Sequence, residues 1–303
     1  MAYKKRSFLI SIVLFLSITL YSQNKYMPPN PYYGRDGEHW TRFIITNPGY
    51  MGPNALPVPE LNSGNLGSEI RLQSGYAYHL NKYDPTFNLL SRLYYPLYKD
   101  KIALEFSIVP IEIFDMDSIA RFNRHTRDMR GEGLAMGDFY FGTHIQLFRD
   151  HKVMPDMVFR LVCKTASGIG LAEARYTDAP GYYLDINFGK NIRKFGSGKV
   201  QSRFTGMMGF FSWQTYLKNN RQNDAFIYGA GLLLSHKKWE FHNNVSGYVG
   251  YMRLGDQPMI FRSDFTFKAK KTDFRIGYRW GINDYDYQSF IFSLIWHWEK
   301  KLK

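Results

Sequence analysis

Hydrophobic and polar residues alternate with a period of two along most of the chain after residue 66. One face of the last such stretch carries Phe290, Phe292, Leu294, Trp296 and Trp298. The opposite face carries Ser289, Ser293, His297 and Glu299. A period of two indicates a β-strand, and an apolar, aromatic face opposite a polar face is typical of a strand in a membrane β-barrel. The pattern predicts that the apolar faces meet lipid and the polar faces line an enclosed lumen.

The same alternation predicts strands at residues 68–80, 86–98, 101–113, 136–148, 156–167, 181–191, 200–214, 224–236, 238–252, 258–269, 272–282 and 287–299. Their number is even, as a closed antiparallel barrel with both ends on one side of the membrane requires. Closure matters because an open strand edge would leave unpaired backbone groups in lipid. We therefore expect an all-β fold, a closed antiparallel transmembrane β-barrel of about 12 strands, over residues 67–303.

The connections between these strands fall into two alternating sets. The shorter, basic set is placed in the periplasm and comprises Tyr98–Lys101, Arg149–Pro155, Asn191–Lys199, Lys237–Lys238 and Ala269–Lys271. The other set is placed outside the cell and comprises Asn81–Pro85, Phe114–Ala135, Gly168–Pro180, Tyr216–Asn223, Arg253–Gln257 and Asn283–Asp286. Short periplasmic turns and longer outer loops are the usual arrangement of bacterial outer-membrane barrels.

The chain begins with the pattern of a secretion signal over residues 1–22. A basic start, Lys4-Lys5-Arg6, precedes the apolar run Phe8–Leu20, which is too short for a comfortable transmembrane helix. We expect cleavage near Ser22–Gln23. The mature protein is then expected in the outer membrane of a Gram-negative bacterium.

Residues 23–66 are rich in proline, glycine and asparagine, as in Met27–Pro31 and Pro53–Pro59. Such a segment cannot form a regular strand or helix, although Trp40–Ile45 could be a short ordered piece. Two alternatives are open for this irregular N-terminal segment. It is either a periplasmic tail or a plug in the mouth of the barrel.

Composition agrees with a membrane barrel. Aromatic residues make up 17% of the chain, yet the mean hydropathy is −0.37. Both values fit a barrel because only alternate residues face lipid and aromatic residues gather at the two membrane interfaces. The alternative is a soluble β-sandwich or soluble barrel.

The formal net charge of +13 could suggest nucleic-acid binding. The basic residues instead cluster in the predicted turns, so we expect no nucleic acid as a partner. The single cysteine, Cys163, rules out a disulfide framework within the chain.

The polar faces of the strands predict a set of lumen-lining residues. A charge that faced lipid near the midplane would cost about 2–4 kcal/mol, whereas an inward charge can pair and stay hydrated. The predicted set is Glu69, Arg71, Arg92, Glu105, Asp138, His144, Arg160, Lys164, Asp185, Glu240, His242, Arg262, Asp264, Arg275 and Arg279. These residues either line a polar conduit or interlock and fill a narrow barrel.

The longest outer loop contains a basic repeat, in which every third residue is an arginine: Arg121, Arg124, Arg127 and Arg130. On a helix this spacing gives one basic stripe, which Asp117 or Ser118 could cap and Gly131 could end. The stripe could bind phosphates of lipopolysaccharide or bias a pore toward anions. The alternative is a solvated loop in which the arginines pair with nearby acidic residues.

Three segments carry a family resemblance. They are Gly131-Glu132-Gly133-Leu134-Ala135-Met136-Gly137-Asp138-Phe139-Tyr140-Phe141-Gly142, Lys164-Thr165-Ala166-Ser167-Gly168 and Asp178-Ala179-Pro180-Gly181-Tyr182. Residues 131–190 thereby resemble the outer-membrane transporter family named after the meta-pathway of phenol degradation. In that family a Gly-Asp strand start is followed by a strand end resembling Lys-Leu-Pro-Thr-Gly. Here Thr165-Ala166-Ser167 replaces the usual Pro-Thr. The resemblance implies transport across the outer membrane, and the aromatic content also resembles barrels of the Bacteroidetes.

The expected function is a passive, porin-like channel or transporter for small solutes. A structural or accessory barrel of a surface or secretion machine, with a filled lumen, is the alternative. A lipid-acting enzyme ranks third, and its best candidate group is His242, Asn244 and Ser246, which share one strand face. The histidines show no metal-ligand spacing, so we expect no metal and no cofactor. Outer-membrane lipid and lipopolysaccharide are the expected partners, while the solute and the oligomeric state stay open.

Overall fold

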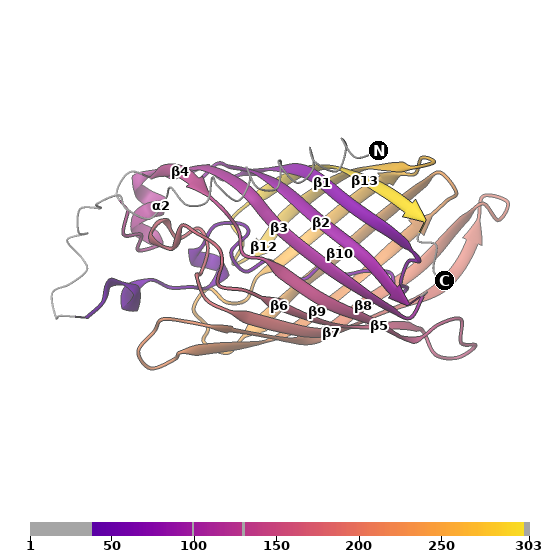
Figure 1. The fold of residues 1–303 in the computed structure, drawn as a ribbon, viewed down its shortest axis with the longest axis horizontal. Coiled ribbons are helices and arrows are strands. Elements are labelled where there is room, and N and C mark those ends of the chain that lie inside the picture. Colours follow the sequence, from indigo (N-terminus) through magenta and orange to yellow (C-terminus); the bar gives the residue numbers. More distant parts are fainter. Residues whose placement is uncertain (1–37, 99, 129–130, 300–303) are drawn as a thin grey trace, which may run out of the picture.

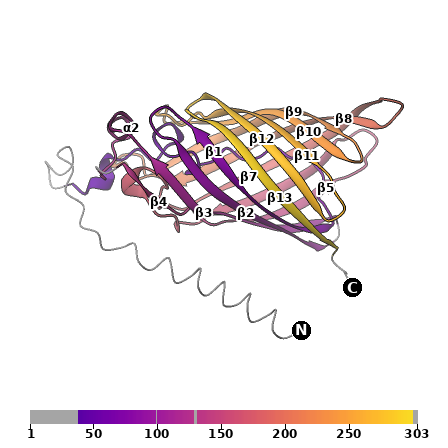
Figure 2. The ribbon, with the colours of Figure 1, turned by 90° about the horizontal axis from the view of Figure 1, so that it is seen from above.

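The computed structural model describes residues 38–98, 100–128 and 131–299. Within them, twelve antiparallel strands close into one barrel (Figures 1 and 2). The strands are β1 (Glu69–Leu80), β2 (Thr86–Tyr98), β3 (Ile102–Asp115), β5 (Tyr140–Phe148), β6 (Asp156–Lys164), β7 (Gly181–Phe195), β8 (Val200–Gln214), β9 (Gln222–Ser235), β10 (Trp239–Gly250), β11 (Met259–Phe267), β12 (Thr272–Asn283) and β13 (Gln288–Glu299). The predicted fold class is confirmed. The signal peptide at residues 1–22 and residues 23–37 lie outside the described ranges.

The first and last strands close the barrel. β1 and β13 pair along their whole length, from Glu69 opposite Glu299 to Leu80 opposite Gln288. Neighbouring strands in the sequence are also neighbours in the barrel, and Figure 2 shows β12, β13, β1 and β2 running side by side. Within the described residues, every barrel strand therefore has two partner strands, as strands in lipid require.

The strand predicted at residues 136–148 begins later in the structure, as β5 at Tyr140. Residues Glu132–Ala135, predicted as the end of an outer loop, instead form a short strand, β4, on the outer part of β3. Pro110 of β3 lies between the two ladders and has no amide proton to donate. The chain crosses this point through Gly137, whose amide donates to the Val109 carbonyl at 2.8 Å.

Apolar side chains cover the outside of the barrel. Each barrel strand contributes at least one large, exposed hydrophobic residue, exemplified in strand order by Tyr76, Leu89, Phe106, Phe141, Leu161, Leu184, Phe204, Phe226, Val245, Phe265, Ile276 and Phe290. Ser289 and Ser293, on the other face of β13, are fully buried. The inward and outward faces therefore follow the predicted alternation. No helix in the described ranges is long and apolar enough to cross a bilayer.

The two ends of the barrel differ. One end, here the turn end, holds the start of β1, the end of β13 and the short connections. The opposite end, here the loop end, holds α2 (Ser118–Asn123), β4 and η4 (Leu171–Glu173), with α2 and β4 at the left in Figure 1. The N-terminal part of the described chain also starts there, with η2 (Trp40–Phe43) and η3 (Pro48–Tyr50).

Residues 38–67, here the lumen segment, run through the barrel from the loop end to the turn end. Near the loop end, Asn47 Nδ2 donates to the Leu254 carbonyl at 2.7 Å. Near the turn end, the Leu66 amide donates to Gln146 Oε1 at 2.8 Å, and β1 begins shortly afterwards. The prolines of this segment prevent a regular ladder, so side chains of the wall satisfy much of its backbone instead.

An apolar cluster packs the lumen segment against one side of the wall. Leu56, Val58 and Leu61 of the segment are buried among residues of β8, β9, β10 and β11. The wall residues of this cluster are Met207, Phe211, Trp213, Ala225, Ile227, Tyr248 and Ile260. The lumen therefore has an apolar side that the alternation rule, which assigns polar residues inward, did not predict. The partner that makes it favourable is the lumen segment itself.

Candidate functional site

Two cavities lie in the lumen, one toward each end of the barrel. The loop-end cavity has a volume of about 200 Å³ and reaches Asn54 and Tyr176. The turn-end cavity has a volume of about 290 Å³ and reaches Leu66 and His297. The residues that line both cavities are Glu60, Gln73, Arg92, Glu105 and Arg275. Glu60 and these four residues therefore lie between the two cavities.

Glu60 is surrounded by guanidinium groups. Arg92 Nη1 on β2 lies 2.8 Å from Glu60 Oε2. On β12, Arg275 Nη1 lies 3.7 Å from Oε2, and Arg279 Nη2 lies 4.0 Å from Oε1. Arg275 and Arg279 are four residues apart on one strand, so they share its inward face. The Glu60 side chain keeps 33% of its surface accessible, because the cavities lie beside it.

The wall supplies this region with more arginines than carboxylates. We call Arg92, Arg262, Arg275 and Arg279 the arginine cluster. Arg275 and Arg279 both pair with Asp264, at 3.0 and 2.8 Å, and Arg92 lies 3.7 Å from Glu105.

Arg262, the remaining member of the arginine cluster, donates to the Val58 carbonyl at 2.6 Å and to Ser246. Two wall carboxylates, Glu105 and Asp264, therefore face four guanidinium groups. Glu60 supplies a third negative charge from outside the wall.

The structure places most of the predicted lumen residues at these cavities. Those that line one or both are Arg71, Arg92, Glu105, Asp138, His144, Arg160, Glu240, His242, Arg262, Asp264, Arg275 and Arg279. The remaining three are Glu69, Lys164 and Asp185. They pair with His297 at 3.2 Å, with Asp138 at 2.7 Å and with Arg160 at 2.7 Å, respectively.

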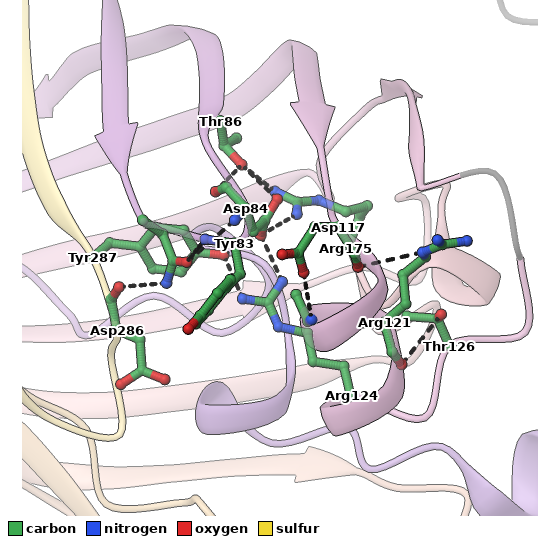
Figure 3. A network of polar contacts seen from close by, with 12 residues as sticks. Tyr83, Asp84, Thr86, Asp117, Arg121, Arg124, Thr126, Arg175, Asp286 and Tyr287 are labelled. Carbon is green, nitrogen blue, oxygen red and sulfur yellow. Dashed lines mark hydrogen bonds and ion pairs between the residues drawn. The ribbon is translucent and has the colours of Figure 1, made fainter.

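A second group of polar residues, here the loop-end network, lies at the loop end, where the loops meet the barrel wall (Figure 3). Asp84 Oδ2 accepts hydrogen bonds from Arg124 Nη1 and Arg175 Nη1, each at 2.6 Å, and from the Tyr287 hydroxyl. Arg175 Nε also donates to Glu112 Oε1 at 2.8 Å. These residues are buried, so the network ties four loops to β3.

Electrostatics in the loop-end network favour the charged form of Asp84. Burial opposes ionisation of this carboxyl. The guanidinium groups of Arg175 and Arg124 outweigh burial and lower the pKa of Asp84 below its usual value. Burial raises the pKa of the Tyr287 hydroxyl, which therefore stays protonated and donates to Asp84.

The arginine repeat does not form one helical stripe. Asp117 does cap the helix α2, but the helix ends at Asn123, and His125 has a positive φ of 55°. Arg124 turns inward to the loop-end network, while Arg127 lies over the Trp40 ring at 5.0 Å. The Arg121 Nε atom donates to the Asp117 carbonyl at 3.3 Å. Arg130 lies outside the described residues.

The group considered for catalysis is not assembled as a nucleophile and its base. His242 Nε2 lies 3.0 Å from Thr205 Oγ1, whereas Ser246 contacts Asn244 and Arg262. A hydrolytic site needs the base within hydrogen-bond reach of the nucleophile. Within residues 38–98, 100–128 and 131–299, no group of three or more His, Cys, Asp or Glu side chains could hold a metal ion.

Sequence analysis missed Glu60 in the lumen and Asp84, Glu112 and Arg175 in the loop-end network. Only Glu60 could have been recognised from the sequence, because it is the one charged residue between Phe43 and Leu66. The other three lie in segments whose local pattern does not reveal their partners.

Among solved structures, the chain is similar to an outer membrane channel from Pseudomonas putida F1. The identity is 10%, the match covers 81% of this chain and 98% of that chain, and the TM-score is 0.51. The chain has the fold of an outer-membrane β-barrel. The transport unit of the autotransporter AIDA-I from Escherichia coli is similar at 8% identity, with 81% and 95% covered and a TM-score of 0.49. The KdgM porin is similar at 6% identity, with 74% and 98% covered and a TM-score of 0.44. No protein-family model and no curated protein sequence matches the chain.

Proposed function

We propose that the protein is a passive channel for small polar solutes in the outer membrane of a Gram-negative bacterium. The observation that carries this proposal is the pair of lumen cavities on either side of Glu60. Charged residues line both cavities, so a polar solute would find hydrogen-bonding partners in each. The lumen segment narrows the path and sets how freely solutes pass.

The location rests on the outer surface of the barrel. Apolar side chains project from every barrel strand, as contact with lipid requires. The expected signal peptide and the similarity to an outer membrane channel support the same location. The resemblance of residues 131–190 to the meta-pathway transporter family adds support for solute transport, and we propose membership of that family as the finer assignment.

A filled, accessory barrel is the second candidate function. The apolar cluster of Leu56, Val58 and Leu61 favours it, because buried apolar contacts hold the lumen segment in place. If the segment never moves, the barrel serves as a scaffold in a surface or secretion machine. The two candidates differ in whether ions cross the purified barrel.

Bilayer recording separates these two functions. The full mature chain, refolded in detergent, is added to a planar bilayer in potassium chloride, with heat-denatured protein as the control. A channel gives discrete conductance steps that the control lacks. A bilayer that stays silent while the protein demonstrably inserts would overturn the channel function in favour of the accessory barrel.

A further inference from the structure

We propose that the arginine cluster is a binding site for small carboxylate solutes, and that Glu60 occupies this site as a built-in carboxylate. The inference rests on the proposed channel function and names the solute class that the channel would take. In this arrangement the lumen segment competes with the solute for the same guanidinium groups.

The contacts of Glu60 are those of a bound carboxylate ligand. Three guanidinium groups, from two strands on different parts of the wall, lie within 4.0 Å of its two oxygens. Guanidinium groups present a planar fork of donors that matches a carboxylate. A free carboxylate in the same place would find the same donors.

The charge balance within the arginine cluster also points to an anion that the wall does not provide. The arginine cluster has four positive charges, and the wall carboxylates that pair with it are Glu105 and Asp264. Buried charges without partners are costly, so the excess of arginines calls for further negative charge. Glu60 supplies one such charge, and one guanidinium charge of the cluster stays in excess.

The position of Glu60 makes exchange with a solute feasible. Its side chain is 33% accessible and faces cavities on both sides. Its neighbours in the segment are anchored, since the Val58 carbonyl accepts from Arg262 and Leu61 is buried in the apolar cluster. The carboxylate can therefore leave the arginines by side-chain rotation while the backbone stays in place.

Chemical rescue tests the binding site without relying on conductance. The Glu60→Ala variant of the full mature chain is refolded and heated with sodium propionate, whose carboxylate can replace the missing group. We expect propionate to raise the midpoint of thermal unfolding by about 2–4 °C, because a ligand that binds only the folded protein stabilises it against unfolding. Propionamide, of the same shape but uncharged, should have no effect.

One further variant and the wild-type protein test whether the rescue is specific to the arginine cluster. Glu60→Ala combined with Arg92→Gln should lose most of the propionate effect, because the closest donor is gone. Wild-type protein should respond less than Glu60→Ala, because its own carboxylate fills the site. If propionate stabilises Glu60→Ala no more than sodium chloride of equal ionic strength does, the proposed site is refuted.

Ion selectivity provides a second test of the proposed site. Glu60→Gln keeps the size of the side chain and should raise the chloride-to-potassium permeability ratio roughly fivefold, because the guanidinium charge is uncompensated. Glu240→Gln removes the same charge from the lumen at a residue that pairs with Lys268, 2.5 Å away, and should change the ratio less. Equal changes in the two variants would show a general charge effect and overturn the arginine site. If neither the wild type nor any variant conducts ions, the channel function is overturned. The chemical-rescue experiment would still show whether the arginine cluster binds a carboxylate.

Discussion

Arg92 on β2 donates a hydrogen bond to Glu60 of the lumen segment, with 2.8 Å between Nη1 and Oε2. This contact joins the barrel wall to a chain segment that has no regular secondary structure at that point. It places the only carboxylate of Phe43–Leu66 between the two lumen cavities. The position of the segment and the chemistry of the lumen are therefore linked.

Truncation of Leu61 should loosen the lumen segment. Leu61 is 5% exposed and packs in the apolar cluster, so Leu61→Ala should weaken segment docking by about 2–5 kcal/mol. Strand pairing is untouched, so the barrel should still form. We expect more frequent or larger conductance steps in bilayers. Leu61→Met conserves volume and should behave like wild type; equal conductance in Leu61→Ala and wild type would contradict a gating role for the cluster.

Removal of the Asp84 charge should destabilise the loop end. Arg124 and Arg175 would remain buried without their shared carboxylate, at a cost of about 3–5 kcal/mol. We expect Asp84→Asn to lower the midpoint of thermal unfolding in detergent. Asp286→Asn is the matched control, because Asp286 is exposed and contributes only a backbone carbonyl to the hydrogen bond from Asn81. A similar midpoint in both variants would speak against the network as a stabilising unit.

Acid should weaken the same network. The pKa of Asp84 is lower in the folded protein than in the unfolded chain, where an aspartate titrates at about 3.9. The unfolded chain therefore binds the proton more readily, so the stabilisation is complete above that value and is lost as the pH falls through the folded pKa. Unfolding midpoints measured between neutral and strongly acidic pH should fall more steeply for wild type than for Asp84→Asn. Parallel curves would exclude this contribution.

A charge on the outer face should impair insertion. Ile276 is 60% exposed in the middle of β12, so Ile276→Arg would place a guanidinium in lipid at a cost of about 2–4 kcal/mol. We expect a lower yield of folded protein in lipid vesicles, measured by the electrophoretic shift between folded and heated samples. Thr266→Arg points into the turn-end cavity and should fold with a yield near wild type. Normal insertion of Ile276→Arg would contradict the assignment of this face to lipid.

Much of the wall could be predicted from the sequence because the alternation of a strand is local. Two neighbouring residues point to opposite faces whatever the rest of the chain does, so period two identifies both strands and faces. The exposed Phe290 and the buried Ser289 and Ser293 follow that rule. The late start of β5 and the separate strand β4 did not follow from it, because Pro110, which lies between the two ladders, is on the partner strand β3.

The sequence by itself determined that the chain forms a barrel with an apolar outside and a charged inside. Only the tertiary structure decided which charges meet. Arg124 has helical spacing from Arg121, yet it pairs with Asp84, 40 residues away. Glu60 meets arginines of β2 and β12 because the lumen segment passes between them. Local periodicity fixes the direction of a side chain, whereas its partner depends on how distant segments pack together, and a local pattern does not contain that information.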